Sequence, residues 1–371
     1  RPLLAAGTAR EQAHLAALEA WLAAAPDRAV VIWEQILADH KRDVLAFRLA
    51  HFVNFWLGRP DRMRASVLAV EPYWDPEAAT YPALLACRCF AFEECGLYIE
   101  AEAAGREAIA RDPTDLWAAH GVAHVLEMQG RRAEGIGWIT RLAPAWAGAN
   151  NLRHHLYWHA ALFHFERGEF DRVLALYDTA FRDLGSPLTV AQPDLYIDIQ
   201  NAVSMLYRLA RQGVAVGTRW EELADKAEAR VGDCFSAFTL PHWTMALAAT
   251  RRWDAAERLI DGMRRCAAGA GVLAAQVRTA ALPVSKAVLA AARGDPIRAV
   301  TLMRPALGAM SGLGGSHAQQ DVLDQLFLDA ALAGGLQEDA TLLLERAAGR
   351  VPVPLQRRRG YAAAARTLGF C

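Results

Sequence analysis

Apolar residues recur along the chain with the three-to-four-residue spacing of amphipathic helices, and short polar breaks separate these segments. The alternation that is typical of strands is absent from the sequence. The pattern predicts helix pairs near residues 10–39, 44–72, 81–111, 116–141, 152–183, 193–231, 236–266, 280–308 and 317–348, with a closing helix near 354–368. We therefore expect an all-α chain in which helix pairs follow one another.

Glycines mark the turns inside these pairs. Gly58, Gly96, Gly130 and Gly168 follow one another at intervals of 38, 34 and 38 residues, near the roughly 34-residue period of tetratricopeptide repeats. The segment from Gly96 to Ala101 resembles the repeat consensus, with an aromatic residue two places after the glycine and a small residue five places after it. Helix pairs of this kind bury their apolar faces by stacking. We expect a tetratricopeptide-like superhelix of about eight to nine pairs that forms a single domain over residues 1–371.

The most informative polar residues lie on the first helices of two consecutive pairs. Counted back from the turn glycines, His120, His124 and Glu127 share one face of their helix, and His155 and His159 share one face of the next. The repeat register directs both faces to the concave groove. Two histidines four residues apart can bind one metal ion, and a glutamate one turn away can act as a ligand or a general base.

Two further polar residues are candidates for the same site. The register places His242 at a position equivalent to that of His159, where it would orient groups or stabilise charge. Asp198, on the first helix of the sixth pair, would orient a ligating imidazole through its second nitrogen, and an ordinary helix cap or ion pair is the alternative. A hydrogen-bonded structural network is the alternative for the whole group.

Other positions are weaker candidates for substrate binding. His51 occupies a helix-packing position, and Trp158 is expected to pack between helices or to form the wall of a ligand pocket. Ser316 follows a glycine-rich segment, which suggests a phosphate-binding loop or a simple helix cap. Gln319 and Asp321 follow it on the predicted helix.

Composition narrows the possible partners. The chain has 40 Lys and Arg residues and 41 Asp and Glu residues, so its net charge is close to zero, and it has no basic run. Both features argue against a nucleic acid or an anionic membrane surface as the partner. Charged residues interrupt the apolar segments, so we expect no membrane span. Six cysteines, the last of them Cys371, form no CxxC pair, and a reducing cytoplasm is the expected location.

Several segments together resemble the tetratricopeptide repeat protein 38 family. They include Trp117–Met128 with its HxxxHxxE pattern, His155–His159, Ser204–Leu209 and Gly314–Ser316. The resemblance implies a repeat fold and an intracellular protein, and it brings no established activity with it. It includes, at matching positions, His51, the four histidines at 120, 124, 155 and 159, Glu127, Asp198, His242 and the Ser316 region. Asn201 departs from the acidic residue expected at its position, and the N-terminal part of the family's chain is expected to be missing before Arg1.

Two hypotheses of function follow. In the first, the protein is an enzyme that acts on a small molecule, with a divalent metal (Zn, Fe or Mn) bound by the four histidines and Glu127 as the general base for a hydrolytic or lyase-type step. A metal-free version with acid-base catalysis stays open. In the second, the groove of a non-enzymatic scaffold binds a peptide or protein partner.

Overall fold

The computed structural model describes residues 7–370, and Cys371 lies outside them. No strand occurs within this range, and nine helix pairs follow one another. The pairs are α1 (Ala9–Leu22) with α2 (Pro26–Asp39), α3 (Val44–Trp56) with α4 (Pro60–Val70), α5 (Tyr81–Glu94) with α6 (Tyr98–Arg111), α7 (Leu116–Met128) with α8 (Arg132–Leu142), α9 (Leu152–Arg167) with α10 (Phe170–Leu176), α12 (Tyr196–Arg211) with α13 (Arg219–Ala229), α14 (Thr239–Ala249) with α15 (Trp253–Ala267), α17 (Leu282–Ala292) with α18 (Pro296–Met303), and α19 (His317–Ala333) with α20 (Gln337–Arg350). The predicted all-α fold is confirmed.

The turns within the pairs explain the glycine pattern. The predicted turn glycines all have φ between +66° and +80°, which is the left-handed region that side chains disfavour; they are Gly58, Gly96, Gly130, Gly168, Gly294 and Gly335. In the first and seventh pairs, Ala24 (φ 58°) and Arg251 (φ 57°) adopt this conformation without being glycine. The repeat therefore needs a left-handed residue in its turn, and it usually has a glycine there.

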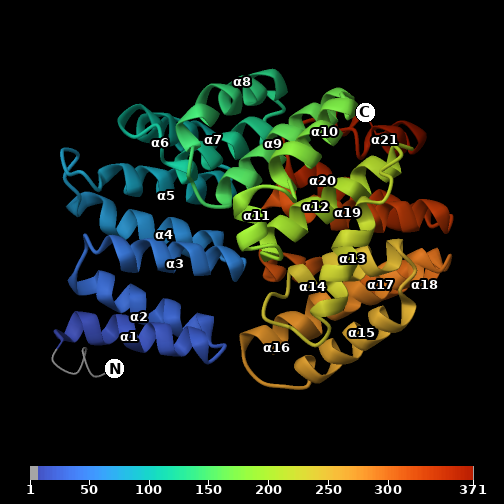
Figure 1. Ribbon diagram of the computed structural model, residues 1–371, viewed down its shortest axis with the longest axis horizontal. Coiled ribbons are helices and arrows are strands. Elements are labelled where there is room, and N and C mark those ends of the chain that lie inside the picture. Colours follow the sequence, from blue (N-terminus) through green and yellow to red (C-terminus); the bar gives the residue numbers. More distant parts are fainter. Residues whose placement is uncertain (1–6, 371) are drawn as a thin grey trace.

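The array curves until its first pairs face α14 and α16 (Val272–Gln276) (Figure 1). Close backbone approaches join the second pair to the segment before α19: a Cβ on Gly58 would lie 2.0 Å from the Ser311 carbonyl oxygen, and a Cβ on Gly314 would lie 2.5 Å from the Trp56 carbonyl oxygen. Helix α19 lies on the inside of the curve, where it packs against α7, α12 and α17 as well as its partner α20. The concave side of this superhelix is therefore partly filled by its own last pair.

The apolar core extends along the whole array in three clusters of buried side chains, one in the first pairs, one around α5 to α9 and one in the later pairs. Trp33, Phe47 and Phe90 belong to the first cluster, Trp138 and Phe163 to the second. This distribution is expected where each pair buries its apolar face against the next.

Some predicted boundaries are wrong. A short helix, α11 (Pro187–Ala191), precedes the sixth pair, and the eighth pair starts early with α16 (Val272–Gln276), which continues through a π-helical turn into α17. The single helix predicted near 354–368 is split into a 3₁₀ turn at Leu355–Arg357 and α21 (Ala362–Thr367). Tertiary contacts impose this break, because Arg358 donates to Asp321 and to the Ala347 carbonyl oxygen.

The expectation that no segment is apolar enough to span a membrane also needs correction. Residues Val272–Ala292 form a continuous helical stretch of 21 residues with a mean hydropathy of 1.2. Half of its most apolar window is buried inside the protein, and its helices pack against α14, α15 and α18. We therefore interpret this segment as a core helix of the array.

Candidate functional site

Two neighbouring helices carry the central histidines. The Asp115 side chain caps α7 by accepting hydrogen bonds from the backbone N–H groups of Trp117 and Ala118 at 2.8 and 3.1 Å. Helix α9 ends at Gly168, whose φ of 78° allows a left-handed C-cap. The helices α7 and α9 pack side by side, so one face of each is held against the other.

Four imidazoles meet at this contact, and we call them the histidine quartet: His120, His124, His155 and His159. One ligand nitrogen from each lies within 4.8 Å of those of the other three. The Nε2 atoms of His120 and His124 are 2.8 Å apart, and the ring centroids within the quartet are 4.4 to 6.5 Å apart. Nitrogens around a tetrahedral zinc ion lie about 3.3 Å apart, given Zn–N bonds of about 2.0–2.1 Å. The quartet therefore has the dimensions of a metal site after small movements of its side chains.

Two of the quartet imidazoles are oriented by polar partners on their outer sides. His159 Nδ1 lies 2.7 Å from Glu127 Oε2, and His155 Nδ1 lies 3.1 Å from Asn201 Oδ1. Such partners fix the tautomer of a ligating histidine and leave Nε2 available. The Nε2 of His159 is indeed buried without a hydrogen-bond partner within residues 7–370. Glu127 thus contacts an imidazole directly, and its role as a general base stays a prediction.

A pair of carboxyl groups approaches the quartet from α5. Glu93 Oε2 is 3.6 Å from His124 Nδ1, and both groups are fully buried. Glu93 and Glu94 face each other closely enough to share a proton, yet neither oxygen of Glu93 has a partner of ordinary hydrogen-bond geometry among the described residues. With His124, these two glutamates form a second group of side chains that are close enough to bind a metal ion.

Sequence analysis missed Glu93, although the repeat register contained the signal. Glu93 stands three residues before Gly96, as Glu127 stands three residues before Gly130. Equivalent positions of consecutive repeats lie side by side in a superhelix, and the two carboxyl groups reach different members of the quartet: Glu93 lies 3.6 Å from His124 and Glu127 lies 2.7 Å from His159.

Burial controls the protonation of this cluster. It lowers the pKa of His155 to about 4, and it lowers the pKa values of His120, His124 and His159 well below the usual value, with the neighbouring imidazoles adding to the effect. Burial raises the pKa of Glu127 to about 8. The imidazoles are therefore neutral at neutral pH, which is the form that binds metals.

The cluster lies beneath the last helix pair, which fills part of the concave side. The four histidines have exposed fractions of only 0 to 3%. The start of α19 covers them, and Glu94 accepts a hydrogen bond from the backbone N–H of His317 at the helix N-terminus. This closure places the quartet inside the protein.

The predicted role of Asp198 needs correction. Its Oδ2 lies 3.0 Å from Nδ1 of His154, and its Oδ1 accepts from Asn151 at 3.3 Å. His154 is outside the quartet, as expected from its different helix face. Asp198 therefore orients a neighbouring histidine, while Asn201, the residue that departs from the expected acid, contacts His155.

His242 and His51 do not join the quartet. His242 Nδ1 donates to the Phe238 carbonyl oxygen of its own helix at 2.9 Å, and the two rings pack together. His51 is buried against Phe90 and Trp117, and neither of its nitrogens has a hydrogen-bond partner within residues 7–370. Their predicted catalytic and substrate roles stay predictions.

Trp158 is part of the wall around the quartet. Its ring stacks on His155 with a centroid distance of 5.2 Å and an interplanar angle of 15°. Arg208 lies on the ring, 6.0 Å from its centroid. The contact holds His155 in place, which agrees with the packing role that the sequence left open for this tryptophan.

Ser316 and Gln319 form a capping box at the start of α19. The Ser316 hydroxyl accepts from the Gln319 backbone N–H at 3.3 Å, and the Gln319 side chain accepts from the Ser316 backbone N–H at 3.0 Å. The helix-cap alternative is therefore confirmed for Ser316. A substrate role for the two side chains stays a prediction.

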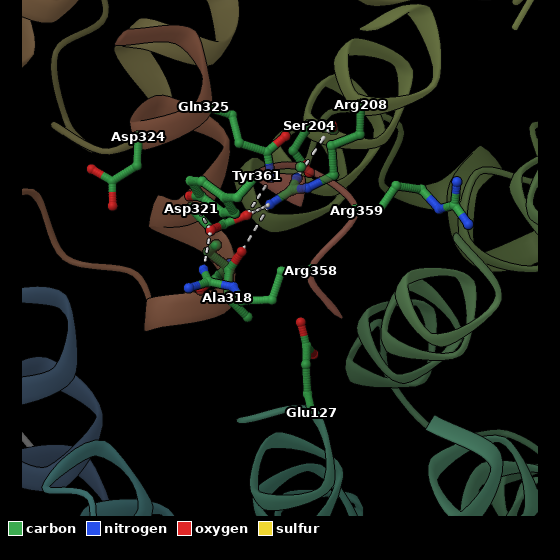
Figure 2. A network of polar contacts seen from close by, with 12 residues as sticks. Glu127, Ser204, Arg208, Ala318, Asp321, Asp324, Gln325, Arg358, Arg359 and Tyr361 are labelled. Carbon is green, nitrogen blue, oxygen red and sulfur yellow. Dashed lines mark hydrogen bonds and ion pairs between the residues drawn. The ribbon is translucent and has the colours of Figure 1, made fainter. Parts of the chain in front are cut away.

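Asp321 is the centre of a polar network between α12, α19 and the C-terminal segment (Figure 2). It accepts hydrogen bonds from Tyr361, Gln325 and Arg358, and Arg208 lies 3.5 Å away. Figure 2 shows Glu127 pointing toward this network from α7. The arrangement links the last helix pair to the quartet.

The paired helices, the left-handed turns and the continuous stacking define the protein as a tetratricopeptide-like helical-repeat protein. No protein-family model matches the chain.

Among the solved structures to which the chain is similar are three tetratricopeptide-type chains, each at 13% identity. The APC/C hetero-tetramer Cut9–Hcn1 matches over 86% of this chain and 57% of its own with a TM-score of 0.45. The P58(IPK) TPR domain matches over 97% and 98% with a TM-score of 0.28, and yeast Tom70 over 92% and 86% with a TM-score of 0.28. The chain thus spans little more than half the length of the first of them.

Proposed function

We propose that this protein is a tetratricopeptide-like scaffold whose central repeats bind one divalent transition-metal ion through the histidine quartet. The observation that carries the proposal is the convergence of four buried imidazoles whose ligand atoms lie within 4.8 Å of one another. Three ring nitrogens of the quartet, His120 Nδ1, His124 Nδ1 and His159 Nε2, are buried without a hydrogen-bond partner within residues 7–370. Each such group costs about 1–3 kcal/mol, and a bound ion would offset that cost.

The charges around the quartet support this proposal. Glu93 is fully buried, and the groups that act on it most strongly are two other carboxyl groups, those of Glu94 and Glu127. Burial and these neighbours raise the pKa of Glu93 well above its usual value, so its charged form is unfavourable without a nearby cation. A divalent ion between His124 and His159 would supply that positive charge.

The donor set indicates the kind of metal. Imidazole nitrogens suit zinc, iron, copper and nickel, and manganese prefers oxygen donors. Four protein ligands around one ion are typical of a closed structural site, whereas catalytic zinc sites usually keep one position open. This favours zinc with a stabilising role, with iron as the next candidate and manganese the least favoured of the three.

Metal analysis of purified protein tests the proposal. We expect about one equivalent of metal per wild-type chain after zinc loading and gel filtration, and a loss of at least tenfold in His124→Ala and His159→Ala. His242→Asn is the matched control, because it removes a buried histidine outside the quartet and should retain the metal. Undiminished metal in both quartet variants would refute the ligand assignment, as would wild-type protein that binds no zinc.

The same proposal includes assignments of the family, the partner and the cellular compartment. Similarity to the tetratricopeptide repeat protein 38 family rests largely on the HxxxHxxE pattern and on the segment His155–His159, which together contain the four histidines of the quartet. A peptide or protein partner on the repeat surface is the interaction that suits an extended helical array. A cytoplasmic location is the corresponding proposal for the compartment.

Enzymatic action on a small molecule is the second candidate function. What favours it is a small cavity of about 60 Å³ beside Glu127, lined also by Arg208 and Asp321, which has room for water next to a carboxyl group that contacts His159. Hydrolysis of p-nitrophenyl acetate by zinc-loaded protein, compared with Glu127→Gln, tests this candidate. Equal rates in the two proteins would eliminate it.

A further inference from the structure

An apolar cavity of about 270 Å³ lies between the first pairs of the array and the segment from α12 to α16. The first pairs contribute Trp21, Phe52 and Trp56, while Tyr196 of α12 and Phe235 of the loop before α14 line it from the opposite side. None of the residues that line it belongs to the histidine quartet, so it is independent of the proposed metal site.

The described residues that line this cavity carry no charge, and their polar groups are mostly engaged. Asn151 donates to Asp198, and Gln276 donates to the Gly312 carbonyl oxygen. Gln200 is the exception: its Nε2 donates to Thr239, while its buried Oε1 has no hydrogen-bond partner within residues 7–370. A buried acceptor without a donor is unfavourable, so this oxygen is suited to receive a hydrogen bond from a bound molecule.

We propose that this cavity binds a neutral small molecule with an aromatic or otherwise apolar body and one N–H or O–H donor. The aromatic walls favour the body through burial and ring contacts, and Gln200 Oε1 accepts the hydrogen bond. Charged ligands are excluded, because they would lose their hydration without meeting an opposite charge. The volume is slightly below the roughly 300–1,000 Å³ of typical ligand pockets, so the molecule is limited to about two or three rings.

The matched probes N-phenyl-1-naphthylamine and 1-phenylnaphthalene test this proposal by fluorescence titration. Both are neutral and of similar shape, and only the first has an N–H donor. We expect saturable binding of one N-phenyl-1-naphthylamine per chain, and binding at least tenfold weaker in Leu273→Trp, which fills the cavity from α16. Leu332→Trp is the matched control, because Leu332 is 41% exposed on α19 and does not line the cavity.

The hydrogen bond is tested separately with Gln200→Met. This variant should weaken the binding of N-phenyl-1-naphthylamine by several-fold and leave that of 1-phenylnaphthalene unchanged. An equal effect on both probes would refute the role of Gln200. The absence of saturable binding to the wild-type protein, or unchanged binding to Leu273→Trp, would overturn the site itself, and circular dichroism confirms that each variant keeps its helices.

Discussion

Replacing His242 with asparagine tests how burial controls the protonation of an imidazole in this fold. His242 is 1% exposed, and burial lowers its pKa from 6.5 to about 4. Below pH 6.5 the unfolded chain binds a proton at this site and the native protein does not, so the native state loses stability as the pH falls. Each pH unit corresponds to about 1.4 kcal/mol, so the free energy of unfolding falls by about 3 kcal/mol before the loss levels off near pH 4.

Urea unfolding between pH 4.5 and 7.5 measures this effect. Asparagine can keep a donor near the Phe238 carbonyl oxygen, but it does not titrate. The difference in free energy of unfolding between wild type and His242→Asn should therefore change with pH below 6.5. The other titrating groups cancel in that difference. His40→Asn, at an exposed position, is the control. A constant difference between wild type and His242→Asn across the whole pH range would refute the reasoning.

Three further substitutions test separate parts of the fold. Arg251→Gly should raise the free energy of unfolding in urea by about 0.5–1 kcal/mol, because the strain of an exposed residue at φ 57° is relieved; a lower free energy of unfolding would contradict this. Tyr361→Phe should lower the free energy of unfolding by about 1–3 kcal/mol, since Asp321 loses a buried donor. An unchanged free energy of unfolding would show that the Asp321 network contributes little to stability. Gly121→Ala should lower the free energy of unfolding by about 1–3 kcal/mol, because its new Cβ would lie 2.6 Å from the Cys89 sulfur. Adding Cys89→Ala to this variant should restore part of the lost stability, and no recovery would show that the strain arises elsewhere.

The order of the helices and the pairing of the central histidines could be predicted from the sequence because both depend on local spacing. Turn glycines such as Gly130 mark the left-handed turn, and residues four apart, such as His120 and His124, must share a helix face. The same reasoning separated His154 from His155, because adjacent residues point about 100° apart. These inferences need no knowledge of how the helices pack on one another.

Only the tertiary structure decided which side chains touch within the cluster and what covers it. Glu93 reaches His124 through the packing of α5 on α7, and Asp198 contacts His154 because of the way α12 lies on α9. The quartet is buried because α19 lies inside the curve, and that position depends on contacts between residues more than a hundred apart, such as Arg208 with the Ala318 carbonyl oxygen. The spacing of residues within one helix carries no information about such distant contacts, since they follow from the curvature summed over all the repeats.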